Sequence, residues 1–201
     1  MVIGGSESGI DIAHFLIGMG DTVTVLDASA PWGSRESDSS YGLSPYTFDR
    51  LRAVKASGRA TFIAERAERI SLTEIKTKSH TLCLTHPAID ATGFDITQSL
   101  AGRLFDFQDG VPEINKHDES TLYDNVFLVG PHVQHKTADT EKRAIFCFIY
   151  KYRQRFAVVA KEMLARLGGN WQKGAEKILA EYEKKGFLLE DLSGCGDACP
   201  C

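Results

Sequence analysis

The sequence lacks the features that define several large protein classes. Its longest uninterrupted apolar stretches, such as residues 146–150, are far too short to cross a bilayer. No basic segment followed by an apolar run and a small-residue cleavage site opens the chain, so no signal peptide is predicted. The net charge of −4 gives no general attraction to nucleic acid or to anionic membranes. These absences favour a cytoplasmic globular protein without a nucleic-acid or membrane partner.

Cysteine is scarce, with five residues, but three of the five crowd into the end of the chain as Cys195, Cys199 and Cys201. A reducing compartment argues against a disulfide framework. The three thiols could exchange disulfides, could bind zinc or copper(I), or could have no role. We expect a redox tail over residues 194–201, in which Cys195 pairs with Cys199 or Cys201. No metal site is predicted, since His132 and His135 lack a convergent third ligand.

What the sequence does contain is a glycine-rich turn between a strand and a helix. Apolar residues 1–3 precede Gly4-Gly5-Ser6-Glu7-Ser8-Gly9, and a helix is expected to about Met19. Its apolar face is expected to hold Ile12, Phe15, Leu16 and Met19. A second strand at residues 22–26 ends at Asp27. A strand, glycine turn and helix followed by an acid after the next strand are typical of a dinucleotide-binding βαβ unit.

This turn predicts where a dinucleotide would bind. The amides of a first helical turn are unpaired and the helix dipole is positive there, so a pyrophosphate fits. Gly4 allows the tight turn, Gly9 allows strand and helix to approach, and Ser6 takes the place of the usual middle glycine. The candidate cofactor-binding residues of the turn are Gly4, Gly5, Ser6, Glu7, Ser8 and Gly9.

The choice between NAD and NADP stays open. Asp27 would accept hydrogen bonds from the adenosine ribose and repel a 2′-phosphate, which favours NAD. Arg35 could instead receive that phosphate.

Further along the chain the pattern predicts an α/β protein that ends in two helices. Ser44-Pro45 opens a helix that closes before Gly58, and short strands are expected at residues 60–64, 70–76 and 81–84. Residues 106–123 are expected to be irregular, and residues 125–129 to form a strand before Gly130. A long helix over about residues 140–167 and a shorter one ending at Gly186 should follow. The long helix should bury Ile145, Ile149, Tyr152, Phe156, Val159, Met163 and Leu167, with Lys151 and Arg155 in solvent.

Three segments resemble the two-dinucleotide flavoproteins, namely the pyridine nucleotide-disulfide reductases and the bacterial flavin-containing monooxygenase-like proteins. Residues 2–11 resemble their nicotinamide-binding turn, and Ala91-Thr92-Gly93-Phe94-Asp95 resembles the segment that leaves the nicotinamide domain for the flavin domain. Residues 125–130 are similar to their last flavin-domain strand. The resemblance implies cofactor roles for Thr92, Gly93 and Gly130, although Pro131 stands where the family has an acid.

The same resemblance implies a C-terminal part of such an enzyme, because the family's first, flavin-binding glycine turn has no counterpart here. We expect a Rossmann-like NAD(P)-binding unit at residues 1–89 and the C-terminal portion of a flavin domain at residues 90–193. The expected function is NAD(P)H-dependent flavoprotein oxidoreduction by a fragment or one half of a split enzyme. FAD would bind only where an upstream segment or a partner polypeptide completes the site, and self-association is left open. The alternatives are a non-catalytic dinucleotide- or partner-binding remnant and a thiol-tail metal-binding protein.

Overall fold

The computed structural model describes residues 1–34, 36, 38–136, 143–168 and 171–192, with the backbone alone at 171–173. The chain divides into two compact units, which we call unit 1 (Met1–Phe94) and unit 2 (from Asp95 onward). Among the described residues, no helix combines the length and the apolar character that crossing a membrane requires.

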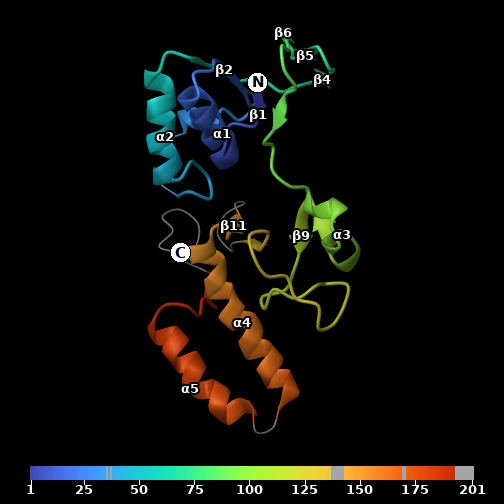
Figure 1. Ribbon diagram of the computed structural model, residues 1–201. Helices are drawn as coiled ribbons and strands as arrows, with labels where there is room; N and C mark the ends of the chain where they lie inside the picture. The colour runs from blue at the N-terminus through green and yellow to red at the C-terminus, as the bar shows by residue number, and fades with distance from the viewer. Residues whose placement is uncertain (35, 37, 137–142, 169–170, 193–201) are drawn as a thin grey trace. The chain divides into compact units, whose positions relative to one another are not determined.

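Unit 1 is built around a parallel sheet with the strand order β3-β2-β1-β7. Figure 1 shows β1 and β2 of this sheet with the helices α1 and α2 beside them. In chain order its elements are β1 (Val2–Ile3), α1 (Glu7–Gly18), β2 (Val23–Leu26), a 3₁₀ turn (Pro31–Gly33), α2 (Pro45–Ala56), β3 (Ala60–Ile63), β4 (Arg69–Ile70), β5 (Glu74–Lys76), β6 (Thr81–Cys83) and β7 (Ile89–Asp90). Strands β4, β5 and β6 form a separate antiparallel sheet. The sequence-predicted helices and strands of this unit have counterparts within a few residues, except that residues 70–76 are not one strand, because the chain turns there between the antiparallel strands β4 and β5.

The two central strands, β1 and β2, are short apolar runs whose residues are mostly buried, as is usual in parallel sheets. The edge strands β3 and β7 are more exposed. Val2 of β1 pairs with Val25 of β2 on one side and with Ile89 of β7 on the other. Val2 and Val25 are fully buried, and α1 and α2 add Ala13 and Val54 to the same cluster. Because β1 is paired on both sides, the turn that follows it emerges in the middle of the sheet edge.

The face of helix α1 that is buried differs from the one that the sequence pattern predicted. Gly9, Ile10 and Ala13 are its buried residues, whereas Phe15 and Met19 are 66% and 68% exposed. Ile12 and Leu16 are only partly buried. Gly9 lies where the glycine turn brings strand and helix close together, and Ile10 packs against Leu43 and Leu51.

Helix α2 begins as the sequence predicts. The Ser44 hydroxyl accepts a hydrogen bond from the Thr47 amide at 3.2 Å, which caps the helix, and Pro45 occupies the first helical position. Gly58, which follows the helix, has a φ of +67°.

Unit 2 is less regular. Its described elements are a 3₁₀ turn (Ile96–Gln98), α3 (Ala101–Leu104), β8 (Asp106–Gln108), β9 (Val111–Glu113), β10 (Gln134–Lys136), β11 (Arg143–Ile145), α4 (Ile149–Leu167) and α5 (Trp171–Lys184). Strands β8 and β9 form one antiparallel pair, and β10 and β11 form another. The two final helices lie side by side (Figure 1). The predicted α/β class, with a parallel sheet early in the chain and two helices at its end, is confirmed.

Three expectations for unit 2 are wrong. Residues 125–129 form no strand and contribute only an isolated bridge between Glu119 and Phe127. Residues 106–123 are not irregular throughout, because the dipeptide Asp109-Gly110, with φ of +54° and +77°, turns β8 into β9. The long helix begins at Ile149, since the residues before it pair as β11.

Helix α4 buries Val159 as expected, but its buried face otherwise differs from the expected one. Ile149 and Leu167 are 67% and 70% exposed, whereas Lys151 and Arg155 are 2% and 0% exposed. Two charged side chains are thus buried on this helix, whereas the apolar periodicity predicted that only aliphatic and aromatic residues would be.

Candidate functional site

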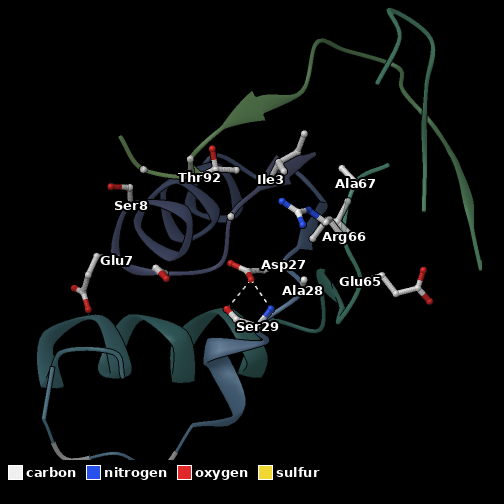
Figure 2. Close-up of a pocket in the computed structure, with 15 residues that line it drawn as sticks. Ile3, Glu7, Ser8, Asp27, Ala28, Ser29, Glu65, Arg66, Ala67 and Thr92 are labelled. Carbon is white, nitrogen blue, oxygen red and sulfur yellow. Dashed lines mark hydrogen bonds between the residues drawn. The ribbon is translucent and has the colours of Figure 1, made fainter. Parts of the chain in front are cut away.

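A pocket of about 590 Å³ lies in unit 1 where the parallel strands end (Figure 2). Its walls come from the segments that follow β1, β2, β3 and β7, so it occupies the carboxyl edge of the whole sheet. In open parallel sheets ligands bind at this edge, beside the strand where the connections change direction. Here that strand is β1, because the chain moves from β1 to β2 and β3 on one side and returns to β7 on the other.

The glycine turn borders this pocket, and at two of its positions backbone atoms leave no room for a side chain. Gly4 has a φ of +100°, and a Cβ there would lie 2.3 Å from the Ala91 carbonyl oxygen. A Cβ at Gly9 would lie 1.9 Å from the carbonyl oxygen of Gly4. Gly9 therefore lets β1 and α1 approach closely, as the sequence predicted, and Gly4 also lets the end of β7 come close, which it did not predict.

The N-terminus of α1 opens at the same turn. Ser6 is the N-cap residue, but its hydroxyl makes no capping hydrogen bond to the helix. Ser6 and Ser8 are exposed and line the pocket. The amides of a first helical turn lack intrahelical acceptors, so they are available to an anionic ligand.

Glu7 lies in this turn but its carboxylate serves another contact. It accepts hydrogen bonds from the Ser44 amide at 2.6 Å, from the Ser44 hydroxyl at 2.7 Å and from the Thr47 hydroxyl. In Figure 2 its side chain points toward α2. These bonds join α1 to the start of α2 and keep a negative charge turned from the place where a phosphate would lie.

Asp27, just after β2, binds the backbone of the glycine turn. Its Oδ2 accepts a hydrogen bond from the Gly5 amide at 2.7 Å. Its Oδ1 accepts from the Ser29 amide at 2.8 Å and from the Ser29 hydroxyl at 2.7 Å. The acid that the sequence assigned to the adenosine ribose therefore also holds the glycine turn and the start of the next loop.

Trp32 is a contributor that sequence reasoning missed. A Cβ at Gly5 would lie 2.5 Å from the Trp32 ring, which also packs against Phe62 with ring centroids 5.0 Å apart. The indole thus fixes the peptide that precedes the α1 N-terminus. The available signal was the tryptophan itself, a large aromatic residue in a loop that otherwise reads as polar.

Thr92 and Gly93 line the pocket beyond β7. The Thr92 amide and hydroxyl donate to Asp90 Oδ1 at 3.0 and 2.7 Å. The hydroxyl, followed by the amide, holds the pKa of Asp90 below its ordinary value, so this carboxylate stays ionised. Gly93 has a φ of +93°, which allows the chain to leave the sheet sharply.

Glu65 and Arg66, after β3, also line the pocket and were missed because nothing in their local pattern distinguishes them from surface charges. The Thr77 hydroxyl and the Ser79 amide lower the pKa of Glu65 to about 2. Arg66 is exposed, and within the described part of the chain no hydrogen bond or ion pair is found for it.

Unit 2 contains a network of buried charged side chains. Asp118 and Arg155 are both 0% exposed. Arg155 donates to Asp118 twice, from Nε at 3.0 Å and from Nη2 at 2.7 Å. His135 Nε2 lies 2.5 Å from Asp118 Oδ1, so this histidine is a packed member of the network. A second pair joins Glu119 to Arg166, whose guanidinium lowers the pKa of Glu119 to about 2.

Most of the sequence-predicted site residues lie at the pocket of unit 1, and the others lie elsewhere. Gly4, Ser6, Glu7, Ser8, Asp27, Thr92 and Gly93 all line the one pocket, and Gly5 and Gly9 complete the turn that borders it. Gly130, with a φ of +105°, belongs to unit 2 and follows no strand. Arg35, Cys195, Cys199 and Cys201 lie outside the described residues, and within those residues no cluster of three or more histidine, cysteine or acidic side chains could hold a metal ion.

Comparison with known proteins gives both a family and a fold. The sequence model of the family described as pyridine nucleotide-disulphide oxidoreductase matches residues 1–130. Solved structures with a similar fold include a pyridine nucleotide-disulfide family oxidoreductase from Enterococcus faecalis V583, with 16% identity and a TM-score of 0.56. They also include a bacillithiol disulfide reductase from Bacillus cereus, with 19% identity and a TM-score of 0.55. A third is the water-forming NADH oxidase from Lactobacillus brevis bound to NADH, with 17% identity and a TM-score of 0.56.

These alignments cover 80%, 82% and 81% of the chain but only 37%, 49% and 36% of the three solved chains. The chain thus spans at most about half the length of the structures that it resembles.

Proposed function

The chain belongs to the pyridine nucleotide-disulphide oxidoreductase family, and from that premise we propose that unit 1 binds the dinucleotide of NAD(H) or NADP(H). The observation that carries this proposal is the glycine turn at the carboxyl edge of the sheet. It leaves the α1 N-terminus open to a pocket of about 590 Å³, a size within the range of small-molecule sites.

The residues present fit a pyrophosphate at this turn. A Cβ at Gly4 or Gly9 would close the approach of the three elements, and Ser6 leaves the first-turn amides uncapped. The helix dipole and those amides favour a negative group at this position. A nicotinamide dinucleotide bound there would supply hydride chemistry, while the protein holds and orients it.

The described residues of unit 2 do not fit a flavin. The segment before Gly130 is not a strand, and Pro131 offers no carboxylate for a ribityl chain. We therefore derive no reaction step on a flavin from unit 2. The role of the chain in NAD(P)H-dependent flavoprotein oxidoreduction is a proposal at the level of the family, as are a partner polypeptide that supplies FAD and a cytoplasmic location. A disulfide or oxygen as the final electron acceptor is likewise a proposal at that level.

The redox role of Cys195, Cys199 and Cys201 remains a separate prediction from the sequence, because these residues lie outside the described part of the chain. The division at residue 89 or 90 between a nicotinamide unit and a flavin-domain portion likewise remains a prediction.

Titration calorimetry of the 201-residue chain with NADH and with NADPH tests the proposed site, using Ser6→Asp as the variant. Aspartate is a good N-cap residue, so the helix should fold. Its carboxylate would oppose a pyrophosphate at the same turn, and we expect both dinucleotides to bind about tenfold more weakly or worse.

Ser71→Asp is the matched control. Ser71 lies in the same unit, outside the pocket, and its hydroxyl accepts hydrogen bonds from the amides of Thr73 and Glu74 in a turn. This variant should bind both dinucleotides as the wild type does. Absence of binding of either dinucleotide to the wild type at millimolar concentration would contradict the proposal, and so would unchanged binding to the Ser6→Asp variant.

A further inference from the structure

The pocket contains four charged side chains, and three of them are already matched. Glu7 accepts three hydrogen bonds from Ser44 and Thr47. Asp27 accepts three from Gly5 and Ser29. These donors fix both carboxylates in place and spread their charge over backbone and hydroxyl dipoles.

The third carboxylate, Glu65, is matched in the same way. It accepts a hydrogen bond from the Ser79 amide at 3.1 Å and lies 3.3 Å from His80 Nδ1. In Figure 2 its carboxylate points away from the pocket.

Arg66 is the unmatched charge. Among the residues that the structure describes, it is the one cationic side chain in the pocket wall, and no carboxylate or carbonyl is bonded to it. Figure 2 shows its guanidinium pointing into the space between Ile3 and Asp27. A guanidinium offers five N–H donors in a planar fork that fits a phosphate with two parallel hydrogen bonds.

The position of Arg66 separates it from the pyrophosphate turn. The turn follows β1, whereas Arg66 follows β3, two strands away in the order β3-β2-β1-β7. Neighbouring strands lie about 4.8 Å apart, so roughly 10 Å separates the ends of these two strands. The acid that ends β2 marks the side of the adenosine ribose in dinucleotide-binding folds. Arg66 therefore lies on the adenosine side, beyond Asp27.

Asp27 itself is less suited to select NAD than its place in the sequence indicates. A carboxylate has about four lone-pair sites, and three donors already occupy Asp27. Its negative charge is partly offset by those donors. The unmatched charge on the adenosine side of the pocket is thus positive.

We propose that Arg66 determines the choice of cofactor by binding the 2′-phosphate of NADP(H). This inference rests on the proposed dinucleotide site in unit 1, and it replaces the preference for NAD that Asp27 gave on sequence grounds. The guanidinium would donate to the phosphate oxygens from the β3 side, while the pyrophosphate common to both cofactors stays at the α1 N-terminus.

The test measures the affinities of the wild type, Arg66→Gln and Arg66→Lys for NADPH, NADH, 2′,5′-ADP and 5′-AMP by titration calorimetry. We expect the wild type to favour NADPH over NADH and 2′,5′-ADP over 5′-AMP. Arg66→Gln should weaken the two 2′-phosphorylated ligands about tenfold or more and the other two by less than about twofold, because it removes a charge-assisted bidentate contact. Arg66→Lys should recover part of the loss.

Arg69→Gln is the matched control, since Arg69 is exposed in the same unit, on β4, and does not line the pocket. It should leave all four affinities unchanged. Equal weakening of NADPH and NADH by Arg66→Gln would overturn the inference, because it would place Arg66 on the adenine ring or on the pyrophosphate. A wild type that binds NADH as tightly as NADPH would also overturn it while leaving the dinucleotide site intact. A wild type that binds neither would contradict that site itself.

Discussion

In unit 1 the largest fully buried side chains are aliphatic, among them Ile10, Leu26 and Leu51, whereas in unit 2 the largest is that of Arg155. Unit 1 is also limited by backbone approach, because two glycines of its turn meet carbonyl oxygens where a Cβ would be. Unit 2 has an apolar cluster that includes Phe105, Val133 and Phe146, and beside it the buried Asp118–Arg155 pair. We therefore expect an added side chain in the turn to destabilise unit 1. In unit 2 we expect the loss of one buried charge to be destabilising.

The largest expected effect is at the charge network. Arg155→Met leaves Asp118 buried beside His135 without its guanidinium, and removal of one partner of a buried pair costs about 3–5 kcal/mol. We expect urea denaturation to show this loss. Hydrogen-exchange mass spectrometry should place it in residues 106–136 and 149–167, with unit 1 unchanged.

Arg153→Met, on the same helix, is the control, since Arg153 is exposed and its guanidinium lies 4.4 Å from the centre of the Phe187 ring. It should cost at most about 1 kcal/mol, the typical worth of an exposed cation–π contact. An Arg155→Met variant that is as stable as the Arg153→Met variant would show that the buried pair does not stabilise unit 2.

A smaller effect is expected in the turn of unit 1. Gly9→Ala puts a Cβ 1.9 Å from the Gly4 carbonyl oxygen, so the turn must shift, and such overpacking costs about 1–3 kcal/mol. Gly18→Ala, near the end of the same helix, meets nothing within 4 Å and should raise stability by up to about 1 kcal/mol.

Thermal melts of the two variants compare a steric clash with a gain in helix propensity in one helix. We expect the melting temperature to fall for Gly9→Ala and to rise for Gly18→Ala. A Gly9→Ala variant that melts at or above the wild-type temperature would mean that the Gly4–Gly9 approach does not limit unit 1.

The comparison also explains what could be predicted from the sequence. The strands and helices of unit 1 follow local apolar patterns, turn glycines and a cap at Ser44, all of which are readable within a few residues. The buried face of α4 is not readable in this way, because Arg155 is buried by Asp118, which lies 37 residues earlier. The Asp109-Gly110 hairpin is different, since its turn signal is local and was open to prediction.

The candidate site divides along similar lines. The glycine turn and Asp27 carry a spacing that sequence alone can recognise. Trp32 and Arg66 lie at the site only because the chain folds back onto the sheet. The residues next to them in the sequence do not predict this.

The central claim, a dinucleotide at the carboxyl edge of the unit 1 sheet, is tested most directly by amide hydrogen exchange of the 201-residue chain with and without saturating NADPH. Ligand bound at that edge should slow exchange in the segments that wall the pocket and form its turn, namely residues 3–10, 26–29, 65–67 and 91–93. Unchanged exchange in these four segments, or slowing confined to residues 106–136, would contradict the account.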